Sequence, residues 1–143
     1  MKISEHFLLE EFVPQAVYKQ FGEASVAFLD PRIIILAEFV RVFFNKPVII
    51  NNWHKNGIFF YRGFRDPECA IGAKMSQHRF GRAIDINVVG MTPKDIYKAI
   101  LANQEAFMKA GLTTLEDIAD TPTWNHLDCR TTNLPTIKIV KPL

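Results

Sequence analysis

The stretch SQHRFGRAID, residues 76–85, runs on into INVV and carries the pattern that organises the chain. From Ala83 onward apolar and polar side chains alternate, as they do in a strand with one buried face. A period of two places Ile84 on one face and Asp85 on the other. His78 stands just before this strand, and Gly81 permits a tight turn between the two. We therefore expect a strand over residues 83–89, with His78 and Asp85 able to meet at its start.

Helices are expected on both sides of this strand. Asp30 is a suitable N-cap and Pro31 a suitable first-turn residue, so a largely buried helix should begin there and end near residue 45. An amphipathic helix is expected over residues 4–13, before Pro14. Another is expected from Thr92 to about residue 110, where a glycine closes it.

Short strands are expected over residues 48–53, 112–118 and 124–130, with the C-terminal tail adding an edge strand. Residues 54–77 lack periodicity, and a loop of that length is often functional. The order of elements suits an α+β fold, with a small antiparallel sheet and flanking helices. We expect one domain over residues 1–143, with an N-terminal helical segment over about 1–29.

Composition narrows the class of protein. The chain has 143 residues, of which 48% are hydrophobic, so it can form a packed core. Its net charge of +2 comes from scattered residues, so no nucleic-acid partner is expected. No apolar run reaches the roughly 18 residues that span a bilayer, so no membrane insertion is expected. The cysteines, Cys69 and Cys129, form no CxxC pair and are expected to be reduced thiols.

The N-terminal sequence MKISEHFLLEEF also bears on localisation. Its acids Glu5, Glu10 and Glu11 interrupt the apolar residues, which is unlike a Sec-type signal peptide. We therefore expect the chain to be cytoplasmic when it is synthesised. If its substrate lies outside the cell, another component must deliver it there.

A second polar cluster lies in TWNHLDCR, residues 123–130. On a strand, Trp124, His126, Asp128 and Arg130 share one face, and the apolar residues between them point to the other. If this strand neighbours the one that starts at Ala83, its histidine faces the same pocket as the aspartate of the first stretch.

Two imidazoles and one carboxylate are a known donor set for catalytic zinc, which leaves a fourth position open to water. His78, Asp85 and His126 are therefore the expected metal ligands, and Zn²⁺ is the expected cofactor. Zinc in such a site lowers the pKa of water and polarises a carbonyl group.

The joint pattern S-x-H-x-x-G-x-A-x-D followed by W-x-H-x-D resembles the D-Ala-D-Ala carboxypeptidase and L,D-endopeptidase family, peptidase family M15. The resemblance covers about residues 30–130 and implies the Hedgehog/DD-peptidase fold. It implies a zinc metallopeptidase that hydrolyses peptidoglycan stem peptides, with His78, Asp85 and His126 as the ligands. Many such enzymes are phage-encoded, which implies a lysis protein that a holin-type membrane pore releases to the cell wall.

The resemblance also suggests roles for other residues. Its members carry a GYR element whose arginine binds substrate or steadies the oxyanion, and Gly63-Phe64-Arg65 occupies that place. Arg65 can equally be a structural ion-pair residue. Asp128 can orient a ligand imidazole or pair with Arg130. Trp124 and Ser76 are expected at the pocket.

One position departs from the family pattern. Carboxypeptidase members carry a glutamate general base three residues before the last histidine, and this chain has Thr123 there. Asp120, six residues before His126, matches the acidic position of the Hedgehog branch and is the candidate base, although a solvated turn residue is the alternative that its position favours slightly. Glu116 and Asp117 lie further back. Alternatively, hydrolysis is lost and the chain is a non-catalytic, metal-binding member that serves as a binding or virion component.

Overall fold

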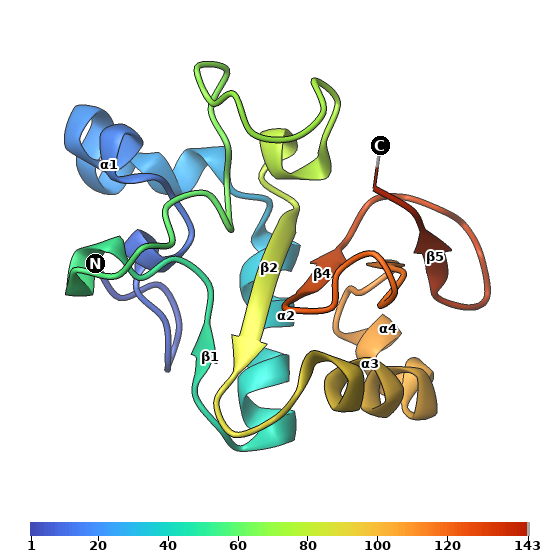
Figure 1. Ribbon diagram of the computed structural model, residues 1–143. Coiled ribbons are helices and arrows are strands. Elements are labelled where there is room, and N and C mark those ends of the chain that lie inside the picture. Colours follow the sequence, from blue (N-terminus) through green and yellow to red (C-terminus); the bar gives the residue numbers. More distant parts are fainter. Residues whose placement is uncertain (143) are drawn as a thin grey trace.

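The computed structural model describes residues 1–142 and has an α+β fold built on a mixed, five-stranded sheet (Figure 1). The strands lie in the order β1-β2-β4-β3-β5. All neighbouring pairs are antiparallel except β3 and β5, which run parallel. The expected antiparallel sheet is thus found except at its last edge. The strands are β1 (Val48–Ile49), β2 (Ala83–Val88), β3 (Thr114–Glu116), β4 (Asn125–Asp128) and β5 (Lys138–Val140).

The centre of the sheet is the pair β2 and β4, and its register sets the two faces. Ile84 lies opposite Leu127, and Asp85 lies opposite His126. Ile84 and Leu127 are fully buried on the apolar face. Because side chains alternate along a strand, the neighbouring Asp85 and His126 emerge together on the other face. The strand expected over residues 83–89 is found over Ala83–Val88, and its facing is confirmed.

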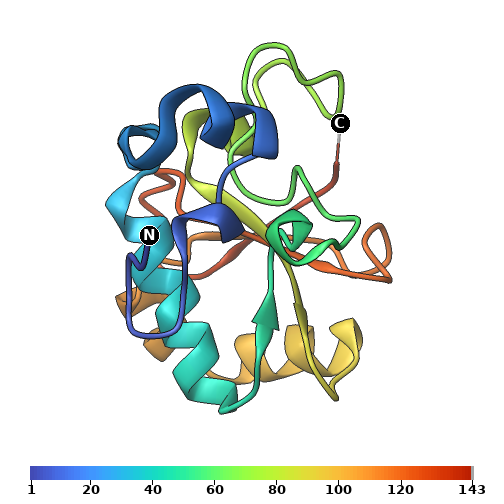
Figure 2. The same cartoon turned by 90° about the vertical axis from the view of Figure 1, so that its left-hand side faces the viewer.

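Helix α2 (Pro31–Phe44) covers the apolar face. It lies behind β2 in Figure 1, and the turned view of Figure 2 shows it as a layer beside the strands. The Asp30 side chain accepts a hydrogen bond from the Arg32 N–H, and Asn45 ends the helix with φ 50°. Buried side chains at helical spacing, Ile33, Leu36, Ala37 and Val40, pack into the core. The expected helix and its capping are confirmed.

The single helix expected over residues 92–110 is two helices, α3 (Pro93–Ala102) and α4 (Gln104–Lys109). Thr92 caps the first through the Asp95 N–H, as expected. Asn103 interrupts the run with φ −129°, and its side-chain amide donates to the Ala99 carbonyl. Asparagine competes in this way with the backbone for hydrogen bonds, so the helix breaks there.

The helix expected over residues 4–13 is wrong. The chain instead forms an isolated bridge between Lys2 and Leu8 and then a 3-10 turn, η1 (Leu9–Glu11). The buried residues there, Phe7, Leu9, Phe12 and Val13, do not fall on one helical stripe. The rest of the N-terminal segment is α1 (Gln15–Phe21) and the 3-10 helix η2 (Gly22–Phe28).

The remaining segments are irregular. The strand expected over residues 48–53 is only two residues long, because the Asn51 side chain bonds the Val13 carbonyl and the Arg62 N–H instead of continuing the ladder. A long segment with the short 3-10 helix η3 (Trp53–Lys55) leads to η4 (Gln77–Phe80). Among the described residues, no helix has the length and apolar character needed to cross a membrane. Both cysteines are buried free thiols.

Candidate metal centre

The structure brings together the side chains of His78, Asp85 and His126. His78 lies on η4, where the Ser76 hydroxyl accepts its backbone N–H. Gly81 ends that turn with φ +69°. Strand β2, which carries Asp85, begins two residues later. His126 lies on β4 directly opposite Asp85. The two sequence motifs, 41 residues apart, therefore meet across one pair of strands.

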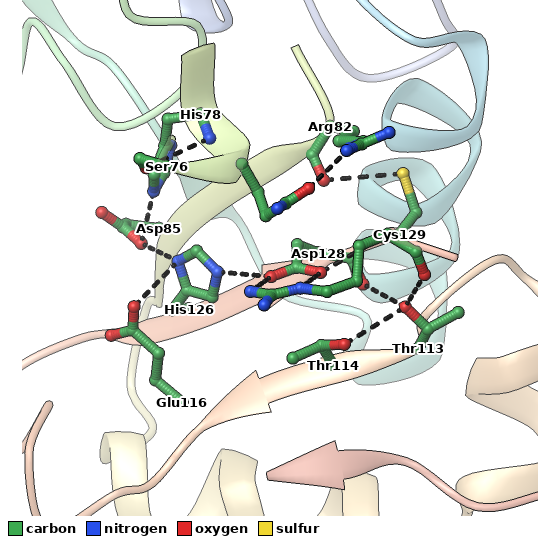
Figure 3. Close-up of polar contacts among 12 residues, drawn as sticks. Ser76, His78, Arg82, Asp85, Thr113, Thr114, Glu116, His126, Asp128 and Cys129 are labelled. Carbon is green, nitrogen blue, oxygen red and sulfur yellow. Dashed lines mark hydrogen bonds and ion pairs between the residues drawn. The ribbon is translucent and has the colours of Figure 1, made fainter. Parts of the chain in front are cut away.

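The distances between the candidate ligand atoms fit a small metal ion. Asp85 Oδ1 lies 3.3 Å from His78 Nε2 and 3.0 Å from His126 Nδ1. Zinc–ligand bonds of roughly 2.0–2.1 Å in a tetrahedron separate neighbouring ligand atoms by roughly 3.3 Å. The exposed fractions are 2% for His78, 7% for Asp85 and 4% for His126, so the cluster is buried. Figure 3 shows Asp85 between the two imidazoles.

Each candidate ligand side chain also has a second polar atom, which faces away from the cluster and bonds another group of the protein. His78 Nδ1 lies 2.8 Å from the Gly63 carbonyl oxygen, which requires a proton on Nδ1 and leaves Nε2 with its lone pair. His126 Nε2 lies 2.8 Å from Asp128 Oδ2, which in the same way leaves Nδ1 as the donor atom. Arg65 Nη2 donates to Asp85 Oδ2 at 3.2 Å. Such outer contacts orient metal ligands and select their tautomers.

Without a metal ion, the pKa values of Asp85 and His126 are shifted by their contacts within the cluster. Burial alone would raise the pKa of Asp85, but the two histidines outweigh it and hold the pKa of Asp85 well below its ordinary value. Burial opposes the charge on His126, yet hydrogen bonds to Asp128 and Asp85 raise the pKa of His126 to about 10. Both ring nitrogens of His126 face carboxylates, so the metal-free ring holds two protons, one of them on the donor atom Nδ1.

Asp128 and Arg130 form the outer support of His126. Asp128 is fully buried and pairs with the Arg130 guanidinium through both of its oxygens. The Arg130 backbone N–H adds a further hydrogen bond to the same carboxylate. Burial opposes ionisation of Asp128, but these bonds lower its pKa. The two alternatives for Asp128, orienting His126 and pairing with Arg130, are therefore both realised.

Glu116 is the acid beside the cluster. Continuing the register of β3 and β4 past Leu115 and Leu127 places Glu116 opposite His126. Its Oε1 lies 3.6 Å from His126 Nδ1. Figure 3 shows the Glu116 carboxylate beside the His126 ring. Burial, more than any other effect, raises the pKa of Glu116.

Asp120 lines the same cavity but engages a different partner. Its Oδ2 accepts a hydrogen bond from Lys141 Nζ at 3.3 Å, and its side chain is 35% exposed. No contact links it to the three candidate ligands within residues 1–142. Thr123 is exposed, and its carbonyl accepts a hydrogen bond from the Asn87 side chain.

A cavity of about 450 Å³ opens beside the cluster. Trp124 and Ser76, which the sequence predicted at the pocket, line it together with Arg65 and all three candidate ligands. The C-terminal segment from Val140 to Pro142 forms part of its wall, which the sequence did not indicate. That segment is placed by the parallel pairing of β5 with β3, a contact that local patterns do not reveal.

Comparison with protein-family models, with curated proteins and with solved structures gives no match for this chain. Any family membership therefore depends on the motifs and on the geometry of the site.

Proposed function

We propose that this chain is a zinc-dependent metallopeptidase that hydrolyses peptide bonds in peptidoglycan stem peptides, with the Hedgehog/DD-peptidase fold. The observation that carries the proposal is the buried His78–Asp85–His126 cluster beside a cavity of about 450 Å³. Each ligand in it has its outward atom already bonded. An ordinary buried ion pair does not need three ligand atoms that converge on one point.

The residues present fit zinc better than a hard cation. Two imidazole nitrogens and one carboxylate oxygen suit zinc, whereas calcium and magnesium favour oxygen ligands. When bound, zinc supplies Lewis-acid activation of water and of the scissile carbonyl. His78 Nε2, Asp85 Oδ1 and His126 Nδ1 would hold it.

Glu116 is the proposed general base. Its carboxylate sits beside the ligand cluster, where Oε1 can take a proton from the attacking water and later give it to the leaving amine nitrogen. Asp120, the base expected from the sequence, is instead joined to Lys141. Glu116 thus supplies the acid that Thr123 cannot supply at the family's usual position.

Arg65 acts through Asp85 in this proposal. Its Nε donates to the Tyr61 carbonyl at 2.8 Å and its Nη2 to Asp85 Oδ2. These two bonds leave the guanidinium fixed, and they orient the other carboxylate oxygen of Asp85 toward the histidines. Arg65 is therefore a positioning residue.

The test is hydrolysis of purified sacculi by the zinc-loaded protein, with released peptides identified by mass spectrometry. Glu116→Gln should keep about one equivalent of zinc and lose at least about 100-fold in rate, the usual contribution of a general base. Asp120→Asn is the matched control, because it removes a carboxylate from the same cavity, and it should lose far less. A large loss in Asp120→Asn with little loss in Glu116→Gln would return the base role to Asp120.

A second candidate is a non-catalytic member of the fold that binds metal and serves as a binding or virion component. The observation that favours it is Thr123, which removes the usual base. Stoichiometric zinc without any release of stem peptides from sacculi would establish this candidate and exclude the first.

A further inference from the structure

Arg62 lies beside the candidate metal centre, and its backbone is bonded on both sides. Its carbonyl accepts a hydrogen bond from the Asp85 N–H at 2.8 Å, and its own N–H donates to Asn51 Oδ1 at 2.8 Å. Since Asp85 is a candidate metal ligand on β2, these two bonds place Arg62 directly next to the strand that carries the site.

The guanidinium of Arg62 is oriented by two uncharged groups. It stacks on the Phe59 ring, with Cζ 3.6 Å from the ring centroid, and its Nη1 donates to Asn87 Oδ1 at 2.5 Å. Asn87 follows Asp85 by two residues on β2, so their side chains lie on the same face of the strand. The polar face of β2 therefore continues from the metal centre to Arg62.

Asn87 also connects this position to the wall of the cavity beside the metal centre. Its side-chain amide donates to the Thr123 carbonyl at 2.9 Å, and the next residue, Trp124, lines the cavity. Two residues along a strand span roughly 7 Å. A substrate group bound at Arg62 would thus lie about two residues of extended peptide from a bond held at the metal.

The charge of Arg62 has no acidic partner in an ion pair within residues 1–142. Two other arginines near the metal centre do have one, since Arg65 pairs with Asp85 and Arg130 with Asp128. Burial lowers the pKa of Arg62, and the charge of Asp85 opposes that shift through a longer-range attraction. A part-buried cation without a paired anion costs free energy, which a bound anionic group would recover.

The free nitrogens of Arg62 form the edge that binds carboxylates elsewhere in this chain. Its Nε and Nη2 make no hydrogen bond within residues 1–142, and neither is shut off from solvent. Arg130 uses the same two nitrogens to hold both oxygens of Asp128, and Arg32 uses them to hold Asp30. Two-pronged pairs of this kind are among the strong hydrogen bonds of proteins.

We propose that Arg62 is a specificity residue that binds a carboxylate of the substrate peptide through Nε and Nη2, within about two residues of the scissile bond. This inference rests on the proposed function and adds one required group of the substrate. In a stem peptide, a D-glutamyl residue linked through its side chain has a free α-carboxylate of this kind. Because Phe59 and Asn87 already orient the guanidinium, little conformational entropy is lost on binding.

The experiment compares two synthetic peptides of the sequence L-Ala-D-γ-Glu-L-Lys-D-Ala-D-Ala. They differ only at the α-carbon of the D-γ-glutamyl residue, which has a carboxylate in one peptide and a carboxamide in the other. Zinc-loaded protein should cleave the carboxylate peptide about tenfold or more better in kcat/KM, because a charged hydrogen bond is stronger than a neutral one. Isothermal titration of the zinc-loaded Glu116→Gln variant should give Kd values that differ in the same direction.

Three variants test whether Arg62 causes this preference. Arg62→Gln should reduce the ratio between the two peptides to less than about threefold. Arg62→Lys keeps the charge without the two-pronged edge, so it should retain part of the ratio. Arg41→Gln is the matched control, because it removes a guanidinium of α2 that does not line the cavity beside the metal centre, and it should keep the wild-type ratio.

Equal kcat/KM values for the two peptides in the wild type would overturn the inference and leave the peptidase proposal standing. A loss in Arg62→Gln that is the same for both peptides would also overturn it, because Arg62 would then only support the fold. Failure to cleave either peptide or sacculi would overturn the proposed function itself. The ratio of the two Kd values would in that case decide the role of Arg62, and equal values would exclude it.

Discussion

Replacing Asp128 by asparagine tests the outer support of the candidate metal centre. The wild-type carboxylate accepts hydrogen bonds from His126 Nε2 on one side and from the Arg130 guanidinium on the other. Asparagine has one acceptor oxygen in place of two. It can satisfy His126 or Arg130, and its amide hydrogens then face the other as a second donor.

The magnitude follows from what the carboxylate does for the ligand. Loss of an outer partner of a ligating histidine typically costs 10- to 100-fold in metal affinity, about 1.4–2.7 kcal/mol. Separately, the fold should lose about 1–3 kcal/mol, because Asp128 is fully buried and leaves an imperfectly paired polar group. The Arg130 side chain is 25% exposed, so water compensates part of that loss.

The assay is a competition titration with a chromophoric zinc chelator, combined with thermal unfolding with and without zinc. The chelator titration gives the Kd for zinc. The thermal curves without zinc give the loss of stability of the metal-free variant. The shift on adding zinc shows how much less the metal stabilises the variant than the wild type. Asp117→Asn is the control, because it removes a carboxylate near the same cavity without any contact to His126, and it should change the Kd by less than about threefold.

A folded Asp128→Asn protein that binds zinc within about threefold of wild type would refute this reasoning. It would mean that Asp128 serves Arg130 alone and that His126 needs no outer acceptor to present Nδ1.

Two further outcomes are expected. Gly81→Ala should cost about 3 kcal/mol or more of unfolding free energy in a urea titration, because its φ is +69° and a Cβ would lie 1.9 Å from the Phe28 carbonyl oxygen. Gly90→Ala is the matched control, because Gly90 also has a positive φ of +81° but an added Cβ would meet nothing within 4 Å. It should therefore cost only about 1 kcal/mol of unfolding free energy. Equal losses in the two variants would contradict the packing argument. Zinc binding at pH 7 should release about one proton, because the pKa of metal-free His126 is raised to about 10 and Nδ1 must lose its proton to bind metal. Calorimetry in buffers of different ionisation enthalpy measures that proton, and a binding enthalpy that is independent of the buffer would contradict it.

The sequence predicted elements whose signals are local. Two adjacent residues, Asp30 and Pro31, mark the start of α2. The alternation after Ala83 indicates β2 and the face on which Asp85 lies. The helix expected over residues 4–13 is wrong because this segment forms a 3-10 turn and an isolated bridge. Tertiary contacts of its apolar side chains stabilise that conformation and override local helix propensity. The break at Asn103 is a side-chain competition that a helical periodicity does not reveal.

The site shows the same division between local and non-local information. His78, Asp85 and His126 were predicted because each lies in a recognisable motif and two of them lie on neighbouring strands. The partner of Asp120 was not predictable, because Lys141 is 21 residues away and is brought there by the pairing of β5. Glu116 was only one of several acids upstream until the register placed it opposite His126.

The position of Glu116 on β3 has a physical advantage over a base on the turn before His126. β3 lies between β4 and β5, and the backbone of Glu116 pairs with Val140 on its outer side. The next residue continues this support, since the Asp117 N–H donates to the Val140 carbonyl at 2.9 Å. A strand bonded on both sides holds a carboxylate more closely than an exposed turn holds Asp120, and a general base needs placement within hydrogen-bonding reach of its proton. The C-terminal strand therefore contributes to the site twice, by lining the cavity and by fixing the strand that presents Glu116.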